Sequence, residues 1–132
     1  MSGREEFRVP GLAEPISHYT DAVRAGNLLF VSGCIAVDGQ GRLVGGDDVV
    51  AQCAQVLRNL GAILAAAGCT PHDVVKVNVY LTDVEDRPLI NPLRQEFFGS
   101  SRPASTLVGV KELPVPGMKV EIEAVAVLPS AG

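Results

Sequence analysis

Two carboxylates near the end of the chain, Glu121 and Glu123, have the residue type and spacing for acid–base chemistry. They alternate with apolar residues, so they share one face of a strand with their carboxylates roughly 7 Å apart. If Glu121 lies in a cleft, burial raises its pKa and suits the carboxyl to proton transfer near neutral pH. The alternative is a pair of solvated charges, and the two residues alone leave both interpretations open.

Other reactive groups give weaker signals. Tyr19 is one of two tyrosines, and such an amphipathic side chain suits either an interface or a pocket wall. Ser105 would need a neighbouring base to act as a nucleophile, and no spacing ties His18 or His72 to it. The three cysteines and two histidines form no metal-ligand motif, so no metal site is expected. An odd number of cysteines at unrelated spacings indicates a reducing, cytoplasmic location.

Length and composition define the class of protein. The 132 residues are 47% hydrophobic and 20% charged, which predicts one soluble domain over residues 1–132. A net charge of -4 without a basic cluster argues against nucleic acid as a partner. The longest apolar run, residues 62–67, is too short to cross a bilayer, so no membrane partner is expected either.

The first half of the chain predicts a hairpin and a long helix. Residues 20–25 and 28–32 flank Gly26-Asn27, a two-residue turn typical of tight hairpins. A short strand is expected at 35–37. From residue 49 to 67 the apolar residues recur at steps of three and four, which predicts an amphipathic helix.

The second half predicts a strand, a helix and two further strands. Residues 74–81 form the first strand. One of its faces is expected to carry Val75, Val77, Val79 and Leu81. The helix follows over about 86–98, and because proline suits a first turn, Pro92 predicts that the regular helix starts there. It is expected to bury Leu89, Ile90, Leu93 and Phe97. Strands at 105–110 and 119–128 complete the chain.

The last strand has two unlike faces. One face carries Val120, Ile122, Ala124 and Ala126. The other begins charged and ends with Val125 and Val127, which a plain solvent face would not carry. The order of elements predicts an α+β fold, with one mixed β-sheet and two helices on one face. Because no helix remains for the other face, oligomerisation is expected.

Three stretches of the chain share a pattern with a known family. They read ISHYTDAV and AGNLLFVSG (16–33), VKVNVYLTD (75–83), and RPAST with VEIEAVA (102–106 and 120–126). Together they resemble the RidA family, also called YjgF or, in older labels, L-PSP endoribonuclease. The resemblance runs from about residue 11 to residue 127, in the family's order and spacing.

The resemblance implies a chorismate-mutase-like fold and a homotrimer with small-molecule sites in clefts between subunits. It implies hydrolysis of reactive enamines and imines to carbonyl compounds and ammonia, without a metal or organic cofactor. It also assigns roles to residues of this chain. Tyr19 corresponds to a pocket tyrosine, and Gly33 to a glycine whose backbone lines the pocket. Glu121 corresponds to the glutamate that positions or activates the attacking water, which leaves Glu123 structural.

The sequence departs from the family pattern at position 105. Ser105 stands where the family motif Pro-Ala-Arg-Ser has a carboxylate-binding arginine. A serine cannot form the two parallel hydrogen bonds that a guanidinium makes with a carboxylate. We expect this to weaken the interaction with a 2-imino acid by about two or more orders of magnitude. Leu107 makes the pocket floor more apolar. Arg102 is an odd offset from Ser105 and so faces the other way, which leaves Arg87 as the better substitute.

Two functions of different classes follow. The first is an enamine or imine deaminase-like hydrolase with Glu121 as the catalytic residue, acting on something other than a typical 2-imino acid. The second is a non-catalytic trimer of the same family that binds a small metabolite or regulates a partner. The ribonuclease label is disfavoured because the chain is acidic and has no basic-aromatic surface.

Overall fold

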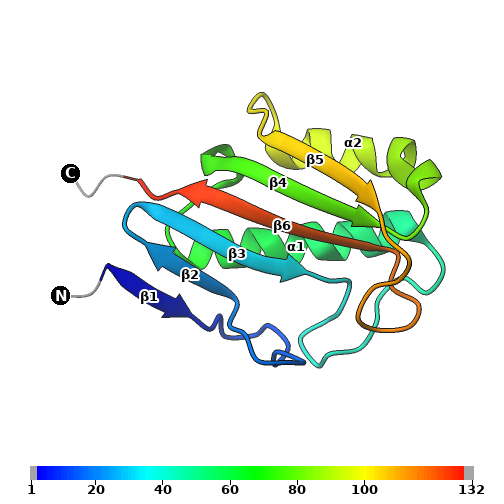
Figure 1. Cartoon of the computed structure of the whole chain (residues 1–132), viewed down its shortest axis with the longest axis horizontal. Coiled ribbons are helices and arrows are strands. Elements are labelled where there is room, and N and C mark those ends of the chain that lie inside the picture. The colour runs from blue at the N-terminus through cyan, green and yellow to red at the C-terminus, as the bar shows by residue number, and fades with distance from the viewer. Residues whose placement is uncertain (1–2, 130–132) are drawn as a thin grey trace.

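A six-stranded sheet with the strand order β1-β2-β3-β6-β4-β5 forms one layer of the molecule, and two α-helices form the other (Figure 1). The computed structural model describes residues 3–129. The strands are β1 (Arg4–Phe7), β2 (Ala22–Ala25), β3 (Leu28–Cys34), β4 (Val74–Leu81), β5 (Ala104–Gly109) and β6 (Val120–Val127). The helices are α1 (Val49–Ala66) and α2 (Arg87–Phe98), with short 3-10 turns at Pro71–Asp73 and Val84–Asp86.

The centre of the sheet is β6, which pairs antiparallel with both β3 and β4. The β2–β3 hairpin turns at Gly26, where φ is +62°, a conformation that glycine adopts without strain. β5 runs parallel to β4. Parallel neighbours need a crossover, and α2 provides it. The sheet is therefore mixed, as the order of elements predicted.

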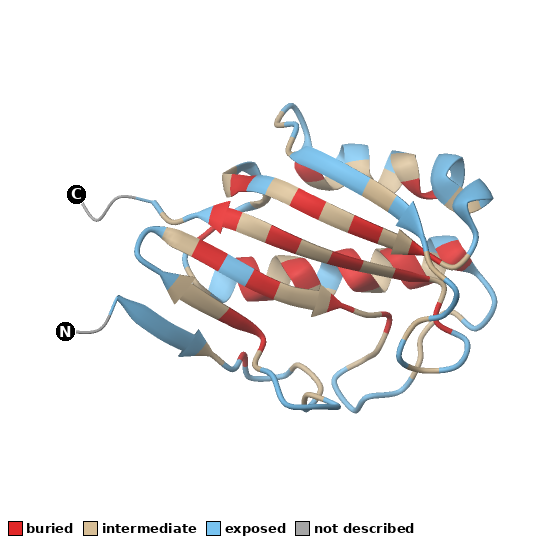
Figure 2. Cartoon of the chain, viewed as in Figure 1, coloured by how far each residue is buried: buried red, intermediate tan, exposed pale blue. Residues whose placement is uncertain are grey.

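Both helices cover the same face of the sheet, and in Figure 1 they lie behind it. Burial alternates along the central strands (Figure 2). On β6 the helix-facing side is fully buried and comprises Val120, Ile122, Ala124 and Ala126. The opposite, uncovered face leaves Phe30 46% and Val127 36% exposed. The predicted α+β architecture with two helices on one face is confirmed, and so is the uncovered second face.

α1 is the core helix. Asp48 caps its first turn by accepting hydrogen bonds from the backbone N–H groups of Val50 and Ala51. Gly68, with φ +77°, follows its end. Among the described residues, α1 is the one helix whose length and apolar composition would allow it to cross a membrane. Half of this helix is buried inside the fold. Core helices of soluble proteins pass the same test.

The strands differ from the sequence-based expectations in three ways. Residues 35–37 form no strand: β3 continues to Cys34, and Val37 makes only an isolated bridge with Leu43. β1 was missed because three of its four residues are charged and exposed, so no alternation marks it. Val75 was expected on the same face as Val77, but a register shift between Val74 and Lys76 turns Val75 away from the buried side, and it is 45% exposed.

The start of α2 also differs from the expectation. The helix is regular from Arg87, and Pro92 lies inside it rather than at its first residue. Asp83 nucleates the preceding 3-10 turn by accepting from the Glu85 N–H at 3.0 Å, so the chain is already helical before Pro92. Ile90 anchors the early helix in the core, whereas Leu89 is 53% exposed.

Candidate active site

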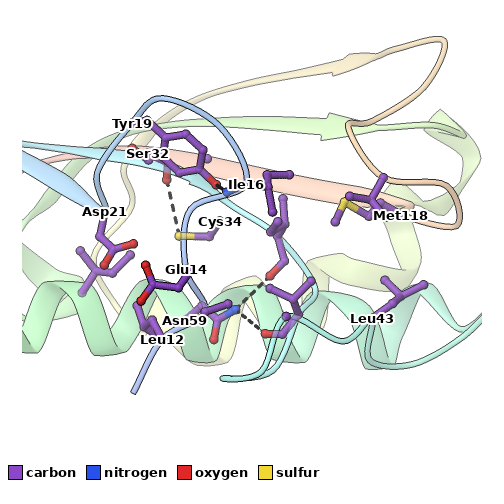
Figure 3. Close-up of a pocket in the computed structure, with 17 residues that line it drawn as sticks. Leu12, Glu14, Ile16, Tyr19, Asp21, Ser32, Cys34, Leu43, Asn59 and Met118 are labelled. Atoms are coloured by element: carbon purple, nitrogen blue, oxygen red, sulfur yellow. Dashed lines mark hydrogen bonds between the residues drawn. The ribbon is translucent and has the colours of Figure 1, made fainter. Parts of the chain in front are cut away.

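A cleft lies where β3 ends against β6, beneath the segment that carries Ile16 and Tyr19 (Figure 3). It has two adjoining parts that share Ile16, Tyr19, Ser32, Gly33 and Ile35. The inner part is about 90 Å³ and reaches Asn59 and Met118. The outer part is about 450 Å³ and reaches Glu121 and Glu123. The cleft therefore joins an apolar recess to a pair of acids.

Gly33 and Glu121 are in direct contact. A Cβ added at Gly33 would lie 2.8 Å from Cδ of Glu121, and closer still to the carboxylate oxygen Oε2. Any other residue at this position would displace the carboxylate. The backbone of Gly33 is not in the left-handed region, so space rather than conformation makes glycine necessary here.

The two glutamates of β6 have different surroundings. Glu123 accepts hydrogen bonds from Asn78 Nδ2 at 2.9 Å and from Tyr80 Oη at 2.6 Å. Glu121 has no hydrogen-bond partner within residues 3–129. Burial raises the pKa of Glu121, and the charge of Glu123 raises it further. Glu123 is thus held in place, while Glu121 is a free carboxyl that binds a proton more readily than an ordinary glutamate.

Tyr19 forms part of the rim of the cleft. It is 42% exposed, and its Oη accepts a hydrogen bond from the Ile16 N–H at 3.3 Å. The preceding segment is fastened by Arg8, which pairs with buried Asp21 at 2.8 Å and donates to the Ala13 carbonyl at 2.9 Å. Asp21 is buried while Arg8 is partly exposed, so one end of this ion pair is shielded from solvent and the contact helps to hold the rim in place.

Cys34 lines the inner part of the cleft but is not a nucleophile. Burial, followed by the charges of Asp21 and Glu121, raises the pKa of its thiol to about 12. A thiolate is the reactive form of cysteine. The thiol is therefore neutral at physiological pH and acts as a small apolar group in the wall of the recess.

The structure brings three of the proposed site residues together and places three elsewhere. Tyr19, Gly33 and Glu121 line the outer part of the cleft. The other three are Ser105, Leu107 and Arg87. Ser105 and Leu107 lie on β5 beside Val77 and Val79, which are fully buried under the helices. They therefore face away from the cleft of their own chain, and Arg87 is exposed at the start of α2.

One residue near Ser105 was not anticipated. Arg94, in the middle of α2, donates from Nη2 to Oγ of Ser105 at 2.9 Å. No periodicity links the two, because they lie on different elements joined by a loop. Within the described residues, no cluster of three or more His, Cys, Asp or Glu side chains could hold a metal ion.

The fold and the cleft define a class of protein. It is a chorismate-mutase-like domain in which a carboxylate, Glu121 of β6, contacts a glycine, Gly33 of the neighbouring strand β3. Residues 11–128 match the family described as Endoribonuclease L-PSP, and the chain belongs to this family. Its relatives include proteins named RidA and YjgF, so the resemblance drawn from the sequence motifs is confirmed.

Three relatives illustrate the likeness. A RutC family protein of Pyrococcus horikoshii is 46% identical over 86% of this chain and 89% of its own length. The 2-iminobutanoate/2-iminopropanoate deaminase of Mus musculus is 42% identical over 85% of this chain and 82% of its own. The crystal structure of the E. coli YjgF gene product has a TM-score of 0.85 and 35% identity, covering 93% of this chain and 98% of its own.

Proposed function

We propose that this chain is a deaminase-like hydrolase that converts a reactive enamine or imine to a carbonyl compound and ammonia, without a cofactor. The observation that carries the proposal is Glu121: a half-buried carboxyl with a raised pKa and no partner in the described chain, facing an open cleft. A carboxyl with a raised pKa takes up and releases its proton at a higher pH than an ordinary glutamate, which suits it to acid–base catalysis. The mouse relative's name, 2-iminobutanoate/2-iminopropanoate deaminase, supports the reaction class.

Glu121 has two tasks in this reaction. As water attacks the carbon of the protonated imine (C=NH2⁺), the Glu121 carboxylate takes a proton from the water, and the nitrogen becomes a neutral amine on a tetrahedral carbon. The carboxyl then returns its proton to that nitrogen while the new hydroxyl loses one to solvent. The C–N bond breaks, a C=O bond forms, and ammonia leaves. Backbone groups at Gly33 and the ring of Tyr19 orient the substrate.

The cleft is proposed to lie between subunits of a cytoplasmic homotrimer. The uncovered sheet face supports association, because Phe30 and Val127 are exposed apolar residues on neighbouring strands. The partners expected are a small molecule and further copies of the chain. With a net charge of -4, the chain offers nucleic acid no electrostatic attraction.

A non-catalytic role is the second candidate. The outer part of the cleft is lined by two carboxylates and, among the described residues, by no Lys, Arg or His. A single copy is therefore suited to a neutral or cationic metabolite, which it would bind without turnover.

Turnover of freshly generated 2-iminopropanoate separates the two functions. We expect slow release of ammonia, because Ser105 stands in place of a carboxylate-binding arginine. The rate should still exceed the uncatalysed rate and be abolished in Glu121→Gln, which removes only the ionisable group. Glu96→Gln, an exposed acid on α2, is the matched control and should keep full activity. Wild-type protein that binds 2-oxo acids but gives no acceleration would contradict catalysis and favour the binding role.

A further inference from the structure

Each glutamate of β6 faces one polar residue of β4, but both of these residues donate to the same glutamate. Asn78 lies directly opposite Glu123 and donates to it at 2.9 Å. Tyr80 lies directly opposite Glu121, yet its hydroxyl reaches diagonally along the sheet and donates to Glu123 at 2.6 Å. Aromatic side chains can span this diagonal between paired strands. The strand pairing therefore places Tyr80 beside Glu121 while its hydrogen bond goes to the other acid.

The two hydrogen bonds fix Glu123 through one of its oxygens. Both donors, Asn78 Nδ2 and Tyr80 Oη, bind Oε1. The amide nitrogen can only donate. The hydrogen bond with Glu123 raises the pKa of Tyr80 to about 12, with further contributions from burial and from the charges of Glu123 and Glu121. The tyrosine is therefore a protonated donor at physiological pH, and Glu123 accepts both bonds.

Glu121 has no such donors and no balancing cation. The titratable groups that face it from the surrounding elements are Tyr19 of the rim, Cys34 of β3, Tyr80 of β4 and Glu123 of β6. Among the described residues, Lys76 and Lys119 form no ion pair with Glu121, and Lys76 donates to Thr106 instead. Burial, followed by the charge of Glu123, raises the pKa of Glu121. The fixed charge beside Glu121 is therefore negative.

A negative charge next to a carboxylate strengthens that carboxylate as a base, because the charge favours the protonated form. Proton transfer from an attacking water is more efficient when the pKa of the base lies close to the working pH. Neighbouring carboxyls in unlike surroundings also take unlike roles in acid–base catalysis. In this chain the two donors of β4 produce the difference, since the glutamates themselves are identical and share one strand face.

We propose that Tyr80 is a positioning residue for the deamination: by holding Glu123 as a fixed negative charge beside the cleft, it makes Glu121 the stronger base of the pair. This inference rests on the proposed function and deepens it. It assigns the proton of the attacking water to Glu121 alone and gives Glu123 an electrostatic role. Tyr80 does not touch the substrate in this scheme and acts through Glu123.

Titration of Glu121 tests this coupling without turnover. The carboxyl carbons of the glutamates are followed by NMR across pH, and the Glu121 signal is assigned by its loss in Glu121→Gln. We expect the midpoint of Glu121 to fall in Glu123→Gln, which removes the charge and keeps the shape. It should fall by less in Tyr80→Phe, which keeps the charge and removes one donor. Tyr80→Phe also covers the case in which Glu123→Gln fails to fold.

Glu112→Gln is the matched control for the loss of one negative charge. Glu112 is exposed in the loop before β6 and lines neither part of the cleft. Its replacement should leave the midpoint of Glu121 unchanged. Added salt gives a second control, because dissolved ions screen interactions between charges. Salt should lower the midpoint of Glu121 more in the wild type than in Glu123→Gln.

The pH profile of turnover separates positioning from a merely structural role. Ammonia release from 2-iminopropanoate is measured relative to the uncatalysed rate at each pH. We expect the acid limb of kcat/KM to move to lower pH in Glu123→Gln, and kcat in neutral buffer to fall several-fold because the base is weaker. Tyr80→Phe should show the same changes to a smaller degree, and Glu112→Gln should show neither. A residue that only supports the fold would lower the rate without moving the limb.

The outcomes separate this inference from the proposed function. An unchanged midpoint of Glu121 in Glu123→Gln would overturn the coupling. Loss of turnover in Tyr80→Phe with an unchanged midpoint of Glu121 would place the tyrosine in the chemistry itself and overturn its role through Glu123. A midpoint that falls as expected in proteins that release no ammonia would leave the coupling standing and remove the proposed function. Normal turnover with unmoved pH profiles would do the reverse.

Discussion

Gly33→Ala is the sharpest test of the contact between Gly33 and Glu121. The added methyl would lie 2.8 Å from Cδ and 3.1 Å from Cγ of Glu121, well inside ordinary carbon–carbon contact. The obstructing atoms belong to a flexible side chain beside an open cleft, so the carboxylate can swing away. We therefore expect the catalytic group to move while the fold remains.

The magnitudes follow from this geometry. A displacement of about 1 Å in a reacting group costs roughly 100-fold in rate, and we expect kcat to fall by about that factor. The free energy of unfolding should change by less than about 1 kcal/mol, since the backbone of Gly33 accepts alanine and the lower entropy of the unfolded chain offsets the crowding.

The assay pairs ammonia release from 2-iminopropanoate with urea unfolding on the same preparations. Gly61→Ala is the control: its Cβ would meet Phe97 at an ordinary 3.5 Å, and alanine in a helix stabilises by up to about 1 kcal/mol. It should leave kcat unchanged. Wild-type kcat in Gly33→Ala would refute the link between this contact and the chemistry, and a large loss of stability would show that Glu121 cannot move aside.

Three further predictions concern pH, a buried amide and a thiol. Because the pKa of Glu121 is raised, the folded state holds a proton there more tightly than the unfolded state, and its stability falls as pH rises above the ordinary glutamate pKa of 4.5. Glu121→Gln should therefore have the larger free energy of unfolding at pH 7 in urea titrations. Below pH 4 the variant and the wild type should be equally stable. Gln52→Leu should lose about 3 kcal/mol of unfolding free energy, because the fully buried amide binds the Gly46 and Gly117 carbonyls and the Lys119 N–H; a loss below about 1 kcal/mol would mean that water replaces it. With a pKa of about 12, Cys34 should resist iodoacetamide at pH 8 in native protein, as mass spectrometry of the peptides would show, and rapid alkylation would contradict its burial.

Periodic patterns predicted the parts of the fold whose two faces differ in environment. β4 spans residues 74–81 as expected, and β6 and α1 agree with their predicted ranges to within two residues. The predictions were wrong where strand pairing or a helix cap, rather than periodicity, determines the secondary structure. β1 is a strand only because β2 pairs with it, and Leu89 is exposed because α2 begins earlier than Pro92 indicated.

The candidate site was predictable where sequence motifs carry it. Tyr19, Gly33 and Glu121 came from the family pattern, and the structure places them around one cleft. The electrostatic difference between Glu121 and Glu123 was not accessible, because it depends on hydrogen bonds from β4. The pairing of Arg94 with Ser105 could not be foreseen either, since it depends on how closely α2 packs over β5.

The two outer strands of the sheet differ in how well they resist unwanted pairing. β1 is four residues long and carries Arg4, Glu5 and Glu6, charges that discourage another strand from adding to it. β5 is six residues long, has no charged side chain and leaves Val108 42% exposed. An unprotected strand of this kind is a template for aggregation unless something covers it. A variant that prevents the proposed association of subunits should therefore precipitate instead of yielding a stable, soluble monomer.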